Sequence, residues 1–122
     1  MQKELVRTSI SPWLNLQDSR KAVEFYKAAF GAQETYHLDG GDDGIVSRLA
    51  VDGAEFWVSE GKGPGEETSI RMILTVADPD QLFDRAVKAG ANIVYPVNES
   101  HGWRIGRIID PFGHHWEIGR EI

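Results

Sequence analysis

The chain has 122 residues, of which 41% are hydrophobic and 26% are charged, and this length and composition fit one globular domain. Its net charge is −6 and its 13 Lys and Arg residues are dispersed, which excludes the basic patch of a nucleic-acid-binding protein. There is no cysteine, so disulfides and thiolate chemistry are excluded, and no run of ~20 apolar residues could span a bilayer. With no signal-peptide pattern either, we expect a cytoplasmic protein without membrane or nucleic-acid partners.

The first half of the chain is predicted to fold as a strand, a helix and three further strands. Residues 11–16 alternate as a half-buried strand does. Asp18 stands where an N-cap is expected, before a helix over residues 19–30, and Gly31 is placed to end that helix. Extended segments then follow at residues 34–38, 45–51 and 55–59.

The second half repeats this order. A strand through Arg71 and Thr75 is followed by Asp78, which together with Pro79 and Gln81 forms the start signal of a helix that Gly90 ends. Extended segments follow at residues 92–97, 103–109 and 115–118.

The two halves therefore predict a duplicated α+β fold made of two βαβββ modules in tandem, an open barrel-like arrangement of eight strands. We expect a single domain over residues 1–122, with one module at about 1–60, a linker at 61–67 and a second module at about 68–122. Each helix would cover one face of its own sheet. The opposite, open face would be the candidate site, located between the modules.

Two segments carry a resemblance to a known family. VEFYKAAFGA (residues 23–32) lies in the first helix, and DPFGHHWEI (residues 110–118) closes the second module. With the duplication, they resemble the glyoxalase / bleomycin resistance / extradiol dioxygenase superfamily, the vicinal oxygen chelate proteins. The resemblance implies the fold described above, a divalent metal held by one ligand from each of four strands in many members, and frequent homodimers.

The four positions that the resemblance assigns to metal ligands are mostly changed in this chain. They are occupied by Ser11, Trp57, Arg71 and Glu117, of which only Glu117 is a ligand that the family uses. One carboxylate cannot hold a divalent cation, and a guanidinium beside it repels one. We therefore expect no metal cofactor, with a displaced metal at Glu117 and His115 as the alternative.

Strand alternation sorts the side chains into two faces. One parity is almost wholly apolar and predicts the core: Leu14, Leu16, Phe56, Val58, Met72, Leu74, Val76, Trp116 and Ile118. The other parity is polar and aromatic and predicts a ligand-binding face: Trp13, Asn15, Trp57, Arg71, His115 and Glu117, with Trp103 at the rim.

Several pairs on this face have two interpretations. Arg71 and Glu117 could form an ion pair or hold a ligand anion, and Trp13 and Trp57 could stack on a ligand or on each other. His115 and Glu117 are the catalytic candidates, as a general acid–base pair, or they form a plain polar contact.

The sequence favours a homodimeric protein that binds a small organic molecule in the cavity between the modules without the family metal. The alternative is a lyase-type or dioxygenase-type enzyme of the same superfamily that uses a displaced metal or the His115–Glu117 pair. Whether the chain is an enzyme stays open at this level.

Overall fold

The computed structural model describes residues 8–65 and 70–122. The first module contains β1 (Trp13–Leu16), α1 (Ser19–Phe30), β2 (Gln33–Asp39), a 3₁₀ turn at Gly41–Asp43, β3 (Ile45–Val51) and β4 (Ala54–Glu60). The second contains β5 (Arg71–Thr75), α2 (Pro79–Lys88), β6 (Asn92–Ser100), β7 (Trp103–Ile109) and β8 (His115–Glu121). β4 ends at Glu60, and the last two positions of the predicted linker, residues 66 and 67, lie outside the described residues.

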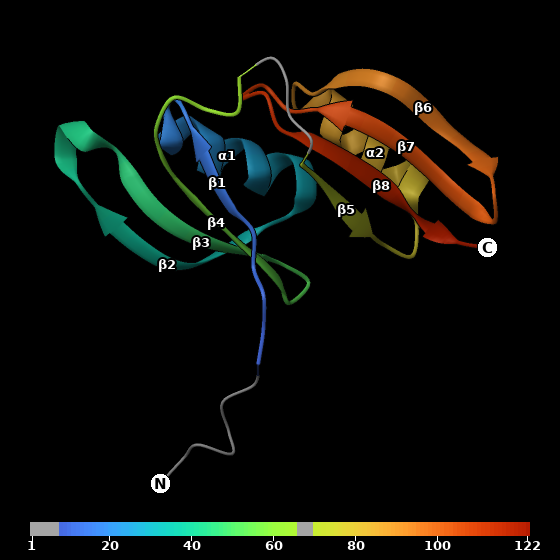
Figure 1. The fold of residues 1–122 in the computed structure, drawn as a ribbon, viewed down its shortest axis with the longest axis horizontal. Coiled ribbons are helices and arrows are strands. Elements are labelled where there is room, and N and C mark those ends of the chain that lie inside the picture. The colour runs from blue at the N-terminus through green and yellow to red at the C-terminus, as the bar shows by residue number, and fades with distance from the viewer. Residues whose placement is uncertain (1–7, 66–69) are drawn as a thin grey trace, which may run out of the picture.

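Each module forms its own four-stranded sheet. The strand order is β1-β4-β3-β2 in the first sheet and β5-β8-β7-β6 in the second, with only β1–β4 and β5–β8 parallel. The sheets lie beside each other, and each helix covers one face of the sheet of its own module (Figure 1). The predicted α+β fold with two tandem modules is confirmed, as an open arrangement and not a closed barrel.

The core lies between the sheets and the helices, on the face that alternation predicts. Leu16, Val58 and Ile118 are fully buried, whereas their neighbours of opposite parity, Trp13 and Ile73, are 55% and 57% exposed. The alternation along β1, β4, β5 and β8 therefore separates a helix-covered face from an open face, as the sequence predicts.

Aromatic side chains join the two modules into one core. Trp116 of β8 packs against Phe30 of α1 at 4.8 Å between ring centroids and against Phe56 of β4 at 5.2 Å. Where the helices meet, Arg85 Nε of α2 donates to the Ala28 carbonyl of α1 over 2.9 Å. These contacts fix the position of one sheet relative to the other.

Asp110, in the turn before β8, is the polar centre of this contact. It is only 2% exposed, and its carboxylate accepts from the Tyr26 hydroxyl, the Trp116 indole nitrogen and the backbone N–H groups of Phe112 and His114. Four donors compensate a buried carboxylate for the water it has lost. The DPFG turn is thus the point at which α1 of the first module is anchored to β8 of the second.

The caps of the two helices differ. Asp78 caps α2 as predicted, because its carboxylate accepts from the Gln81 backbone N–H, and Gly31 ends α1 in the left-handed region at φ 69°. Asp18 is not a side-chain cap of α1, contrary to the prediction. Glu60 takes that role instead, since its carboxylate accepts from the Asp18 and Ser19 backbone N–H groups, both at 2.9 Å.

Candidate ligand-binding site

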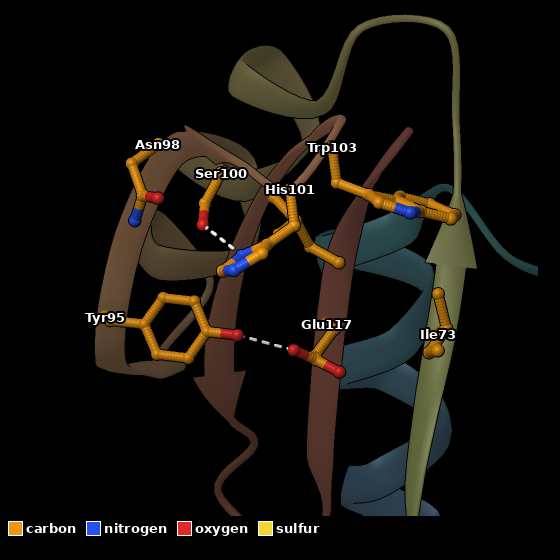
Figure 2. A pocket seen from close by; sticks show the side chains of 8 residues that line it. Ile73, Tyr95, Asn98, Ser100, His101, Trp103 and Glu117 are labelled. Atoms are coloured by element: carbon orange, nitrogen blue, oxygen red, sulfur yellow. Dashed lines mark hydrogen bonds between the residues drawn. The ribbon is translucent and has the colours of Figure 1, made fainter. Parts of the chain in front are cut away.

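A cavity of about 490 Å³ opens on the uncovered face of the second sheet. Its walls come from β5, β6, β7 and β8 and from the turn between β6 and β7, so the second module alone forms it (Figure 2). The lining combines apolar, aromatic and hydrogen-bonding side chains: Ile73, Tyr95, Asn98, Ser100, His101, Trp103, Ile105 and Glu117. Such a mixed lining is typical of a pocket for a small organic molecule.

Glu117 is the ionised group at the centre of this wall. One carboxylate oxygen accepts from Arg71 Nε and the other from the Tyr95 hydroxyl, each at 2.5 Å. Burial acts to raise the pKa of Glu117, but the hydrogen bonds from Tyr95 and Arg71 outweigh it and hold the pKa below its usual value. The carboxylate is therefore ionised and its orientation is fixed. Burial and the same hydrogen bond raise the pKa of Tyr95, which keeps its hydroxyl protonated as the donor.

The retained family position does not fit a metal ion. Arg71 points its guanidinium at Glu117, and Trp57, which offers no lone pair, lies on the other sheet. Within residues 8–65 and 70–122, no group of three or more His, Cys, Asp or Glu side chains is placed to hold an ion. Of the two interpretations of Arg71 and Glu117, the ion pair is the one that the structure contains.

His115 lies next to this pair but does not form the expected unit with Glu117. In the described part of the chain its Nδ1 is buried without a hydrogen-bond partner, and no hydrogen bond joins it to Glu117. Burial lowers the pKa of His115, and the positive charge of Arg107 lowers it further. An acid–base pair of His115 and Glu117 would need a hydrogen bond between them, and the described residues do not contain one.

The candidates of the first module do not reach this cavity. Trp13 and Trp57 stack on each other, with centroids 5.3 Å apart and planes 12° apart, and Trp13 Nε1 donates to Ser59 over 2.8 Å. Asn15 accepts from the backbone N–H of Gly63. A Cβ at Gly61 would collide with the Asn15 amide, so the linker passes directly over this residue.

The cavity between the modules is smaller than the one on the second sheet. It measures about 170 Å³ and lies among Pro12 and β4 on one side and β5 and Trp116 on the other. None of Trp13, Trp57, Arg71 and Glu117 lines it. Of the predicted ligand-binding residues, Trp103 and Glu117 line the larger cavity on the second module instead.

Sequence reasoning found Glu117 and Trp103 but missed Tyr95 and the polar residues of β6. Tyr95 follows an irregularity in the pairing of β6 with β7, which shifts the alternation that would have assigned its face. An available signal was Tyr36, which occupies the corresponding place in β2 after a similar irregularity. The two tyrosines are a further feature of the duplication.

The fold and the cavity define a class: paired βαβββ modules with a cavity on an open sheet face. The family model described as a glyoxalase-like domain matches residues 13–119. The chain therefore belongs to the glyoxalase-like family, and the resemblance to the vicinal oxygen chelate superfamily is confirmed. None of the helices described is long and apolar enough to cross a membrane.

Relatives and solved structures agree with this assignment. Uncharacterised proteins of Mycobacterium bovis and Mycobacterium tuberculosis are 32% identical over 130 residues, which cover 96% of this chain and 86% and 76% of theirs. TioX from Micromonospora sp. ML1 is 27% identical, with a TM-score of 0.76 and coverage of 94% of this chain and 97% of TioX. A gene product of Arabidopsis thaliana is 28% identical, with a TM-score of 0.69 and coverage of 92% and 98%.

The fosfomycin resistance protein FosX from Listeria monocytogenes shares the fold at 18% identity. Its TM-score is 0.76, with coverage of 96% of this chain and 93% of FosX, in a complex with Mn(II) and 1S,2S-dihydroxypropylphosphonic acid. The ion belongs to that protein. In the present chain Arg71 occupies the space beside Glu117.

Proposed function

We propose that this protein binds a small organic molecule in the cavity of the second module, without the metal ion of its superfamily. The observation that carries the proposal is the ion pair of Arg71 and Glu117 beside the cavity. In this proposal Glu117, the one metal-ligand position of the family that the chain retains, serves polar recognition of the organic molecule. Binding is favoured over catalysis because both oxygens of Glu117 are engaged and, in the described residues, no hydrogen bond joins Glu117 to His115.

A second copy of the chain is the expected partner. Trp13 and Leu38 on the first sheet and Ile73 on the second expose more than half of their surface. A two-fold axis that brings the first sheet of one copy over the second sheet of the other would cover both faces at once, because a two-fold interface is self-complementary. The cavity would then be closed by the partner, and the protein would act as a homodimer.

Fluorescence titration with a panel of aromatic compounds of different charge tests the binding. Trp103 lines the cavity and Trp57 does not, so a ligand should change the emission of the Trp57→Phe variant and leave that of Trp103→Phe almost unchanged. If no compound alters the wild-type emission, or both variants respond alike, the cavity is not the binding site.

Two further measurements address the metal and the dimer. Elemental analysis of protein purified without chelators should find far less than one equivalent of Mn, Fe, Ni or Zn. A stoichiometric metal that disappears in Glu117→Ala would contradict the metal-free proposal. Sedimentation should show a dimer that Trp13→Glu dissociates, and a wild-type monomer at all concentrations would exclude the two-fold arrangement.

A further inference from the structure

Each sheet carries one row of four side chains in register across its open face. The aromatic row is Trp13, Trp57, Arg48 and Tyr36, and the ionic row is Ile73, Glu117, Arg107 and Tyr95. Strand order and pairing match position by position. Arg48 therefore corresponds to Arg107, and Tyr36 to Tyr95.

In the aromatic row, Arg48 is fully engaged. Its Nε donates to the Thr35 hydroxyl at 2.9 Å and forms an ion pair with Glu55 at 3.2 Å. Its guanidinium also lies over the Trp57 ring, 5.3 Å from the centroid. A hydroxyl, a carboxylate and an aromatic ring together satisfy this cation.

Each of these partners is changed around Arg107. Thr35 has no paired residue in the register of β2 with β3, and Val94 has none in the register of β6 with β7, so the two residues correspond. Val94 offers no hydroxyl. His115 stands two residues before Glu117, as Glu55 stands two before Trp57, and it offers no negative charge. Glu117 itself is engaged by Arg71 and Tyr95.

Arg107 is consequently left without a partner in the described residues. Its Nε is buried and has no hydrogen-bond acceptor. Arg107 lies on the same face of the sheet as Glu117 and Tyr95, because it is paired directly with both of them on the neighbouring strands. Its positive charge acts to lower the pKa values of Glu117, His115 and Tyr95. A buried guanidinium nitrogen without an acceptor is costly, and few such groups persist without a role.

The charges on this part of the sheet do not cancel. Two guanidinium groups, Arg71 and Arg107, face the single carboxylate of Glu117, which leaves an excess of one positive charge. Burial keeps the third neighbour, His115, neutral by lowering its pKa. The acceptor that the aromatic row finds in Glu55 is missing from the ionic row, and an anionic ligand would supply it.

We propose that the cavity takes a small organic acid whose anionic group, a carboxylate or a phosphate, pairs with Arg107 between Glu117 and Tyr95. Arg107 is not among the residues that line the cavity, but both flanking residues are, and there the apolar body of the acid would contact Trp103 and Ile73 (Figure 2). Because Tyr95 donates its one hydroxyl proton across β7 to Glu117, an anion at Arg107 takes its hydrogen bonds from the guanidinium and not from that hydroxyl. This inference rests on the proposed function and adds the charge of the ligand.

The test compares ligands that share a ring and differ in charge. Benzoate and phenyl phosphate are the anionic probes, benzamide the neutral one and benzylamine the cationic one. Titrations followed by ¹⁵N NMR of the arginine Nε–Hε groups should show that both anions shift the Arg107 signal in a saturable manner, whereas benzylamine does not. A response to phenyl phosphate alone would identify a phosphate site, and to benzoate alone a carboxylate site.

Matched variants locate the effect. Arg107→Gln should weaken binding of the anions by about tenfold or more, which is the loss expected for one charge-assisted contact, and Arg48→Gln should leave it unchanged. Arg107→Lys keeps the positive charge but loses the two-pronged hydrogen bonding of the guanidinium, so its affinity for the anions should lie between those of wild type and Arg107→Gln. This variant replaces Arg107→Gln if the glutamine variant does not fold.

The outcomes separate this inference from the proposed function. Binding of benzoate by Arg107→Gln at wild-type strength would overturn the inference, as would tighter binding of benzylamine or benzamide than of either anion. If neutral compounds enter the cavity and the anions do not, the inference fails and the proposed function stands. If nothing in either panel reaches Trp103, both fail.

Discussion

The aromatic row and the ionic row show how one duplicated scaffold can give a sheet face whose arginine is paired within the protein and a sheet face whose arginine is left for a ligand. In the aromatic row, Trp13 and Arg48 have polar partners within the first module: Trp13 bonds Ser59, and Arg48 bonds Thr35 and Glu55. In the ionic row, the Nε of Arg107 finds no such partner among the described residues, and the other three residues of the row line a cavity. A shared fold thus fixes where side chains lie, and a few substitutions decide which of them remain available to a ligand.

The largest expected effect concerns the turns that precede β4 and β8. Asp110 is buried with four donors, whereas its counterpart Asp52 is exposed with φ 49°, a conformation that Asp and Asn tolerate. We expect Asp110→Asn to reduce the free energy of unfolding by about 2–3 kcal/mol, because the amide leaves Tyr26 or Trp116 without an acceptor. Asp52→Asn should change it by less than about 0.5 kcal/mol.

Urea denaturation of the two variants measures this difference directly. Equal losses at both positions would show that the turns contribute alike and that Asp110 is not the link between the modules. A loss confined to Asp110 would establish that the anchoring of α1 to β8 depends on this carboxylate.

A smaller effect is expected at the position where the rows differ most, Trp57 against Glu117. Glu117→Gln should lower the free energy of unfolding by about 1–2 kcal/mol near neutral pH, a value reduced by the exposure of Arg71. The folded pKa of Glu117 lies below its usual value. Its contribution is therefore complete above the ordinary glutamate pKa of about 4.3 and is lost as the pH falls through the folded value.

Unfolding followed as a function of pH checks the sign. Wild type should lose stability on acidification more steeply than Glu117→Gln, whereas Trp57→Phe should keep the wild-type slope because it removes no titrating group. A Glu117→Gln variant with the full acid slope would show that other carboxylates account for the dependence.

Much of the fold follows from the sequence because the same short-range sequence patterns occur in both halves of the chain. The apolar parity that places Leu16 and Ile118 in the core and the glycine that ends α1 are local patterns, and the structure agrees with them. Glu117 was singled out by the family resemblance, which assigns a metal ligand to its position, and the repeat aligns it with Trp57. The pairing of Arg71 with Glu117 was one of two interpretations and became definite only in the structure.

What the sequence could not supply are contacts between distant segments. Glu60 replaces Asp18 as the cap of α1 across a separation of more than forty residues, and Tyr95 reaches Glu117 from a strand whose alternation is interrupted. The location of the cavity on one module was missed for a related reason. Alternation assigns a face to each side chain, but not the distance between the two faces in the assembled core.

The smallest expected effect concerns Arg48 and Arg107, the two arginines at corresponding positions of the aromatic row and the ionic row. Arg48→Met removes an ion pair, a hydrogen bond and a ring contact, and should lower the free energy of unfolding by about 0.5–1 kcal/mol. Arg107→Met removes a guanidinium without a partner in the described residues and should change the unliganded protein by less than about 0.5 kcal/mol. Thermal and urea unfolding of both variants, without added ligand, give the two values. If Arg107→Met lowers the free energy of unfolding more than Arg48→Met does, then Arg107 already has a partner within the protein, as Arg48 has. If Arg107→Met is neutral, the arginine is retained at no benefit to folding, and its role must be sought in what the cavity binds.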